Sequence, residues 1–312
     1  MTPRQVCIAG ATGYLGTRLV TQLRARSNPV IAILKDRSCD ADQHRLSALG
    51  ATLDFVDASC IQSYSHALSG SDVAISCMAS GNVHVDSTND FWAIDRDANI
   101  RFGLDALRAG AQHVILVATF EGRNSRGVSA FSDAKECAVD AIGAACRLAE
   151  VVFTVIRPTA YFSDLTNRAF DSVQKQGRYT VLGDGLSRIN PVDGEDVAVF
   201  IADCIADPTM AGREHQVGGL DTFTFREIGM LAAQVIGLPH PLKIRSIPLW
   251  PLRFLAAIAA IAGLASRKSR RSAAILRWMI YSSTHDAIAV SCGKRRLYEE
   301  FCSKRDALRL AV

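Results

Sequence analysis

The sequence lacks the cysteine spacings of a metal site or a disulfide framework. Its nine cysteines are an odd number, scattered from Cys7 to Cys302, and none forms a C-x-x-C pair or a Cys/His group with zinc spacing. We therefore expect reduced thiols, no metal and a cytoplasmic location. Strand-like residues begin at Gln5, so no signal or transit peptide is expected. Apolar residues make up 49% of the chain and charged residues 21%, which excludes a disordered or low-complexity chain.

A long apolar run is also missing. The longest uninterrupted one is Phe254–Ala265, with 12 residues, whereas a transmembrane helix needs roughly 18–20. We favour a buried helix over residues 247–265 that roofs an apolar substrate pocket. The alternative is an interfacial helix with peripheral membrane contact through residues 247–271, because a basic group follows the run directly: Arg267, Lys268, Arg270 and Arg271.

Charge is unevenly distributed. The chain has a net charge of +4, yet residues 241–312 hold 14 Lys and Arg against 4 Asp and Glu. Such a basic section suits an anionic partner: a membrane surface, a nucleic acid or a phosphorylated cofactor. The alternative is basic residues spread around ordinary helices. We predict no nucleic-acid partner, and the sequence leaves the oligomeric state open.

Short apolar runs alternate with helix-period segments through the first half of the chain. The strand candidates are residues 5–9, 30–34, 53–56, 73–77, 114–118 and 151–156, and the clearest helical segments between them are 14–26, 42–49, 63–68 and 135–148. Continuous apolar strands separated by helices predict an α/β fold with a doubly wound parallel sheet. After Thr159 the alternation loosens, and helical segments 195–206 and 225–236 stand between loops.

A glycine-rich turn, GATGYLG, joins the first strand to the first helix. Glycines at these spacings allow a tight turn, close approach of a pyrophosphate and close packing of helix on strand, and the helix N-terminus offers free N–H groups to phosphates. We predict a dinucleotide-binding (Rossmann) domain over residues 1–160 and a small α-rich substrate region over 161–312, partly interleaved with the sheet. The predicted cofactor-binding residues of the turn are Gly10, Thr12, Gly13, Tyr14, Leu15 and Gly16.

The end of the second strand decides between the two nicotinamide cofactors. Lys35 and Arg37 flank Asp36, and two cations favour the 2′-phosphate of NADP(H). The alternative is that Asp36 binds the ribose hydroxyls of NAD(H). Asp57 after the third strand and Ala79 after the fourth are further cofactor-binding candidates, and each is equally well explained as part of a capped turn.

Catalytic candidates stand near the carboxyl ends of the next strands. Thr119 ends the fifth strand with a hydroxyl, and Lys135 lies at the start of the following helix. A lysine beside the nicotinamide ribose can hold its hydroxyls and act in proton transfer. Most lysines in a first helical turn are solvated, so Lys135 alone carries little weight.

Several segments together resemble the atypical short-chain dehydrogenase/reductases. They are GATGYLG, the helix with Lys135, VIRPTAYFSD, GDGLSRINPVDGEDVAVFI and VGGLDTFTFREI. The similarity covers residues 5 to about 250. It is strongest to the divinyl chlorophyllide reductase-like and nitrogen-metabolite-repression-regulator-like group, and more distant to isoflavone reductases. It implies a Rossmann fold, an NADP(H) cofactor and a tyrosine acid four residues before the lysine.

Phe131 occupies that tyrosine position and has no proton to donate. The F-x-x-A-K form is similar to that of the divinyl reductases, which reduce a carbon–carbon double bond. We therefore expect an NADPH-dependent reductase of a largely apolar small molecule that transfers hydride to an activated C=C bond, or to a C=O or C=N bond. The catalytic candidates are Lys135, Thr119 and Tyr161. For Tyr161 we favour the alternative, an aromatic wall of the pocket. The alternative function is a redox sensor or scaffold that binds NADP(H) without turnover.

Overall fold

The computed structural model describes residues 2–35, 39–56, 63–80 and 91–310. They form two compact units. The first contains Met1–Arg157 and Val197–His215, and the second contains Pro158–Asp196 and Gln216–Val312. The predicted division into a cofactor domain and a substrate region is a functional one and stays a prediction.

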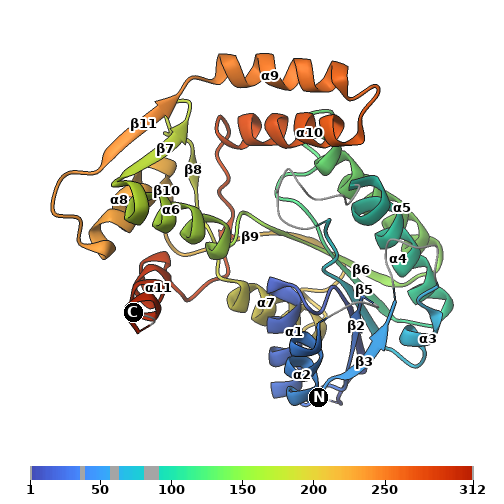
Figure 1. Ribbon diagram of the computed structural model, residues 1–312. Helices are drawn as coiled ribbons and strands as arrows, with labels where there is room; N and C mark the ends of the chain where they lie inside the picture. Colours follow the sequence, from blue (N-terminus) through green and yellow to red (C-terminus); the bar gives the residue numbers. More distant parts are fainter. Residues whose placement is uncertain (1, 36–38, 57–62, 81–90, 311–312) are drawn as a thin grey trace. The chain divides into compact units, whose positions relative to one another are not determined.

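An eight-stranded sheet has the order β12-β9-β6-β5-β4-β1-β2-β3 (Figure 1). Strands β1 to β6 pair in parallel, and the predicted doubly wound α/β fold is confirmed. The sheet's strands are β1 Val6–Ala9, β2 Val30–Leu34, β3 Thr52–Phe55, β4 Val73–Ser76, β5 His113–Val117, β6 Val152–Pro158, β9 Glu214–Gly218 and β12 Val290–Ser291.

Helices cover both faces of the sheet in the first unit. α1 (Tyr14–Ala25), α2 (Asp40–Ala48) and α7 (Gly194–Ala206) lie on one face, and α3 (Ser65–Leu68), α4 (Asn99–Arg108) and α5 (Ala130–Leu148) on the other. Successive strand residues point to opposite faces, so every residue of β1 and of β4 is buried. This explains why the strands are continuous apolar runs in the sequence.

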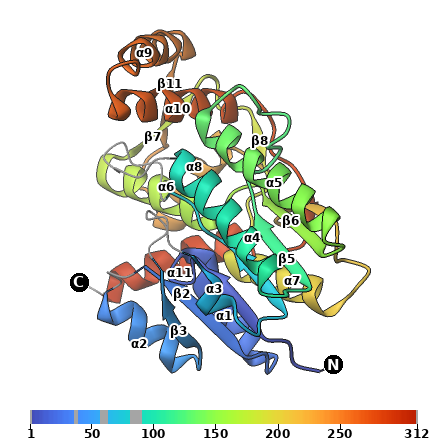
Figure 2. The ribbon, with the colours of Figure 1, turned by 90° about the vertical axis from the view of Figure 1, so that its right-hand side faces the viewer.

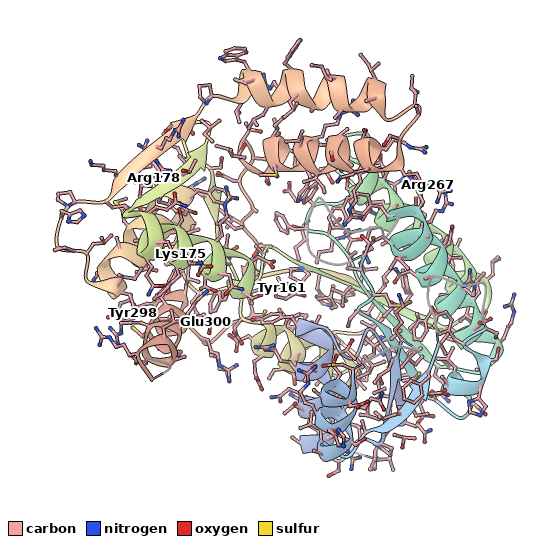
Figure 3. All side chains as sticks on the ribbon, viewed as in Figure 1. Tyr161, Lys175, Arg178, Arg267, Tyr298 and Glu300 are labelled. Atoms are coloured by element: carbon pink, nitrogen blue, oxygen red, sulfur yellow. The ribbon has the colours of Figure 1, made fainter. Side chains whose placement is uncertain are left out.

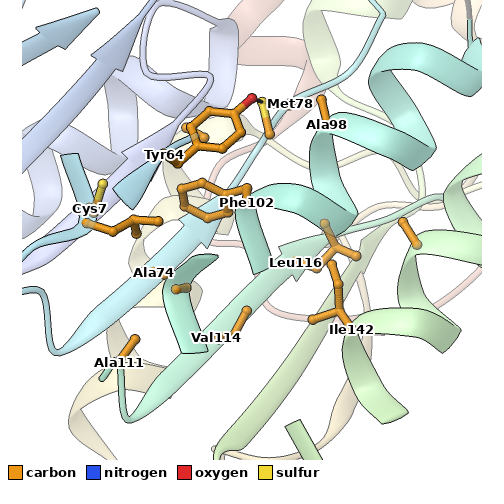
Figure 4. Close-up of a cluster of buried hydrophobic side chains, with 14 of the residues drawn as sticks. Cys7, Tyr64, Ala74, Met78, Ala98, Phe102, Ala111, Val114, Leu116 and Ile142 are labelled. Carbon is orange, nitrogen blue, oxygen red and sulfur yellow. Dashed lines mark hydrogen bonds between the residues drawn. The ribbon is translucent and has the colours of Figure 1, made fainter. Parts of the chain in front are cut away.

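The core beneath α3, α4 and α5 contains strand residues and aromatic side chains (Figure 4). The ring edge of Phe102 meets the ring of Tyr64 at 5.4 Å between centroids. The Tyr64 hydroxyl donates to the sulfur of Met78 at 3.6 Å. Met78 follows β4, so this contact anchors the beginning of the loop at the carboxyl edge of the sheet.

Two predicted boundaries near the catalytic candidates need correction. α5 begins at Ala130, so Lys135 stands in its second turn and not at its start. β5 ends at Val117, which places Thr119 two residues beyond the strand. Because Ser129 caps α5 by accepting a hydrogen bond from the Phe131 N–H at 3.3 Å, the helix starts earlier than its apolar pattern indicates.

The helical segment before β5 has two parts. It begins as a π-helix, η1, over Trp92–Ala98 and continues as α4. A π-helical turn is wider than an α-helical one, and such turns occur frequently at functional sites.

The second unit has its own core. Helices α6 (Phe162–Gln176), α8 (Phe225–Ile236) and α11 (Leu297–Leu310) contribute to it. The rings of Phe170 and Phe301 are stacked within it at 6.2 Å. Two small sheets belong to the unit: β7 (Arg178–Leu182) with β11 (Lys243–Ile247), and β8 (Arg188–Ile189) with β10 (Phe223–Thr224).

Two antiparallel helices complete the second unit. α9 (Leu249–Ala262) and α10 (Arg267–Ser282) lie side by side in both views (Figure 2). The favoured interpretation of residues 247–265 as a buried helix is wrong, because Ala256 is the one buried residue among the described residues of α9. Within the described ranges, no helix combines the length and the apolar character needed to cross a membrane.

Candidate functional site

The turn between β1 and α1 has the backbone that the glycine pattern predicts. Gly10 has a φ of +83°, and a Cβ there would stand 2.9 Å from the carbonyl carbon of Cys77. A Cβ on Gly16 would stand 2.1 Å from the carbonyl oxygen of Gly10. Only glycine fits either position, and the turn lies directly against the chain that follows β4.

The N-terminus of α1 offers its N–H groups to a ligand. Gly13 is the N-cap residue, has no side chain to occupy those groups, and is exposed. The first turn contains no acidic residue, so nothing there competes with an anion for the positive end of the helix. Leu15 is 6% exposed, and its side chain belongs to the core. Only its backbone N–H could therefore bind a cofactor. These features fit a pyrophosphate.

Tyr14 and Thr12 lie beside this turn and are half-buried. The Arg18 guanidinium stacks 3.8 Å from the centre of the Tyr14 ring. Arg45 of α2 donates from Nη2 to the Thr12 carbonyl at 3.2 Å and pairs with Asp42 at 2.6 Å. Sequence analysis missed Arg45 because its helix position alone says nothing about the glycine turn.

The structure describes some of the residues that are predicted to determine the preference for NADP(H) over NAD(H). Lys35 follows β2 and is exposed. Arg37, with Asp36, and Asp57 lie outside the described residues. Ala79 is exposed in the loop after β4.

Lys135 is buried, contrary to the solvated position that a first-turn lysine usually has. It is 3% exposed. Its ammonium donates to the Met78 carbonyl at 2.6 Å and stands 3.2 Å from a carboxylate oxygen of Asp95. The fold therefore brings Lys135 to the same loop, after β4, that the Gly10 turn contacts.

Asp95 was not found by sequence analysis. It lies in η1 with no exposed surface, and its other carboxylate oxygen accepts from the Ser80 N–H at 3.2 Å. A buried carboxylate is stable only when it is paired and hydrogen-bonded, and Lys135 and Ser80 meet that requirement. The sequence offers little indication that Asp95 is buried, because it lies among other charged residues in WAIDRDA.

Asn99, at the start of α4, continues this polar network. Its side-chain oxygen accepts from the Ser76 hydroxyl at 2.6 Å, and its amide donates to the Ile94 carbonyl at 2.8 Å. Cys77 follows Ser76 in the chain. Burial raises the pKa of Cys77 to about 12, against the lowering effect of the Lys135 charge, so its thiol stays protonated and is no nucleophile.

Thr119 is held by its backbone. Its carbonyl accepts from Nη1 of Arg157 at 2.8 Å, and the same guanidinium binds Glu136 of α5 with two contacts of 2.5 and 3.0 Å. The Thr119 hydroxyl is buried and finds no hydrogen-bond partner within the described part of the chain. Buried hydroxyls are almost always paired in folded proteins, so this unpaired one is a candidate ligand-binding group.

The two aromatic candidates lie in different units. Phe131 is half-buried on α5, with its ring edge against Phe91 at 5.5 Å between centroids. Tyr161 is the half-buried residue that precedes α6 in the second unit (Figure 3). It forms a parallel bridge with Val192.

The first unit therefore contains a ligand-accessible helix N-terminus, a buried ammonium and a buried unpaired hydroxyl at one end of the sheet. The ligands of doubly wound folds bind at this carboxyl edge. Among the described residues, no His, Cys, Asp and Glu cluster has the composition of a metal site.

The profile of a family described as NAD(P)H-binding matches residues 10–208. Divinyl chlorophyllide a 8-vinyl-reductase, chloroplastic, from Oryza sativa subsp. indica is 28% identical over 267 residues, covering 80% of this chain and 64% of that protein. The Arabidopsis thaliana protein of the same name is 26% identical over 77% of this chain and 59% of its own length. The chain thus spans less than two thirds of these relatives.

Solved structures show the same fold at low sequence identity. Triphenylmethane reductase of Citrobacter sp., complexed with NADP(H), has a TM-score of 0.70 at 18% identity, covering 96% of this chain and 99% of that one. An isoflavone reductase has a TM-score of 0.70 at 15% identity, covering 97% and 99%.

Proposed function

Because the chain belongs to the NAD(P)H-binding family, we propose that it is an NADPH-dependent reductase of a largely apolar small molecule, and that an activated C=C bond is the hydride acceptor. The observation that carries the proposal is the buried Lys135 ammonium beside the loop that the glycine turn contacts. The similarity to proteins named as 8-vinyl-reductases supports a carbon–carbon double bond as the acceptor.

NADPH, when bound, supplies the hydride. The first-turn N–H groups of α1 and the exposed Gly13 would hold its pyrophosphate. Lys135 has three N–H donors; one donates to the Met78 carbonyl, and the ammonium forms an ion pair with Asp95. A remaining N–H would bind a nicotinamide ribose hydroxyl and so fix the cofactor, and the unpaired Thr119 hydroxyl would bind the cofactor or the substrate.

Proton delivery must differ from that of an enzyme with a tyrosine before the lysine. Phe131 packs against Phe91 and adds apolar surface in place of an acid. Lys135, directly or through a water molecule, is our proposed proton source. Tyr161 stays a second candidate predicted from the sequence.

The second candidate function is a sensor or scaffold that binds NADP(H) without turnover. Phe131 favours it, because a protein that had lost catalysis would tolerate the loss of its acid. The two functions differ in one observable, which is the consumption of bound NADPH in the presence of an acceptor.

That observable is tested by mixing the protein and NADPH with enones, quinones and vinyl-bearing pigments. We expect oxidation of NADPH, followed by the nicotinamide absorbance, with one or more acceptors. NADPH labelled with deuterium at the transferable position should deliver the label to a carbon of the product. Tight NADPH binding without oxidation in any mixture would overturn the reductase and support the sensor.

Cofactor preference is a second expected result. We expect NADPH to bind at least about tenfold more tightly than NADH, because one charge-assisted hydrogen bond to the 2′-phosphate is worth roughly 1.5–3 kcal/mol. Replacing both Lys35 and Arg37 with alanine should remove this preference and leave NADH binding nearly unchanged. The control Arg26→Ala removes a cation at the opposite end of α1 and should change neither affinity. Equal wild-type dissociation constants for the two cofactors would contradict the assignment.

A further inference from the structure

α9 carries an exposed apolar face that catalysis does not explain. Its outward side chains point away from α10 (Figure 3). Spacings of three and four residues place five of the exposed apolar side chains on one stripe. The exposed fractions are 72% for Trp250, 67% for Phe254, 47% for Ile258 and 70% for Ile261, and Leu264 in the following turn reaches 88%.

The surroundings of this face are strongly basic. Residues 228–285 contain eight Lys and Arg and no Asp or Glu. Three of the eight are exposed in the first turn of α10: Arg267, Lys268 and Arg270. Figure 3 shows Arg267 at the beginning of that helix.

These cations lie at the N-terminus of α10, where basic residues destabilise a helix. The N-terminus of a helix carries positive partial charge, so each basic residue there is destabilising, and acidic residues are preferred. The first turn of α10 contains no acidic residue. Its composition is therefore the reverse of what helix stability favours, and an external anionic partner would explain it.

The combination of apolar and basic surface selects the partner. A second copy of this chain would bring two basic surfaces together without an opposing charge, so self-association through α9 is disfavoured. A bilayer with anionic lipids offers both an apolar interior for the stripe and negative headgroups for the cations. α9 is about 21 Å long, shorter than the roughly 30 Å hydrocarbon core, and would lie along the surface.

We propose that the exposed face of α9 and the basic first turn of α10 dock the protein on the surface of an anionic membrane. The docking does not depend on the proposed reaction. It would give the protein access to substrates that are dissolved in lipid.

The experiment is flotation of the full chain with vesicles of phosphatidylcholine alone or mixed with phosphatidylglycerol. We expect binding to the mixed vesicles only, and weaker binding at high salt because ions screen the charges. In a variant with Trp92→Phe and Trp278→Phe, the fluorescence of Trp250 should be quenched by lipids brominated in their acyl chains. Binding without this quenching would overturn insertion of α9.

Two variants separate the apolar and the charged parts. Phe254→Ser with Ile261→Ser, and Arg267→Gln with Lys268→Gln, should each weaken vesicle binding by about tenfold or more. All four side chains are exposed, so folding and NADPH affinity should stay unchanged.

The matched control is Lys175→Gln with Arg178→Gln. It removes two exposed cations of the same unit at α6 and β7 (Figure 3) and should leave binding intact. Equal loss in this control would show attraction by overall charge and overturn the site. Conversion of a dimer to a monomer by the apolar variant, or binding to nucleic acid in preference to vesicles, would overturn the membrane as the partner.

Discussion

Replacing Lys135 with alanine lowers the rate of acceptor-dependent NADPH oxidation by about 100-fold or more and weakens NADPH binding by less than about tenfold. The larger effect falls on turnover because positioned proton-transfer groups contribute about 10²–10⁴ in rate. The glycine turn and α1, which hold the pyrophosphate in our proposal, are untouched. Steady-state kinetics and a direct binding titration measure the two quantities separately.

Lys135→Ala also leaves Asp95 buried without its cation, which destabilises a fold by about 3–5 kcal/mol. A double variant removes this ambiguity. Lys135→Met with Asp95→Asn takes away both charges of the pair and should recover most of the lost free energy of unfolding, while turnover stays low. If turnover instead returns with stability, Lys135 has a structural role only, and the catalytic assignment is wrong.

Gly16→Ala abolishes NADPH binding and lowers the free energy of unfolding by about 3 kcal/mol or more. A Cβ at this position would stand 2.1 Å from the Gly10 carbonyl oxygen and 2.7 Å from Cα of Ala11. Both neighbours are backbone atoms of the turn, so neither can rotate away as a side chain would, and α1 must shift from β1. Thermal or urea unfolding followed by circular dichroism measures the loss.

Gly13→Ala is the matched comparison for this effect. Gly13 has an ordinary φ of −71°, and the nearest atom to an added Cβ is the Gly10 carbonyl oxygen at 3.3 Å. We expect the fold to keep its stability within about 1 kcal/mol and NADPH affinity to fall, because the methyl group occupies the approach of the pyrophosphate. Unchanged affinity in this variant would show that the phosphates do not bind at this turn.

The ion-pair partner of Lys135, Asp95, could not be predicted from the sequence. Asp95 is 40 positions before Lys135, with a strand, a helix and a loop between them, and it resembles any acidic residue on a solvated helix. Burial of both groups at one end of the sheet turns them into an ion pair. Phe131, in contrast, was recognised from the sequence, because the resemblance to the short-chain dehydrogenase/reductases implies a tyrosine four residues before the lysine.

The burial of Lys135 and the exposure of α9 could not be predicted from the sequence. A lysine near a helix start is usually solvated, yet this one is buried against the Met78 carbonyl and Asp95. An apolar segment is usually buried, yet α9 exposes most of its large side chains, because α10 covers one side of it and leaves the other uncovered. An apolar composition predicts that a helix packs against another part of the protein or against a partner. It does not predict which face of the helix is covered.

The sequence by itself determined the parallel α/β fold, the glycine turn and the carboxyl edge as the place of a site. These depend on local periodicity and on backbone conformations that only glycine adopts, which are properties of a few neighbouring residues. The tertiary structure alone decided the partners of Lys135, the contact of Arg45 with Thr12, the unpaired hydroxyl of Thr119 and the exposed face of α9. Each of these features depends on whether two segments that are distant in the sequence come into contact. The free energy of such a contact depends on burial and charge pairing, which arise only when the chain has folded.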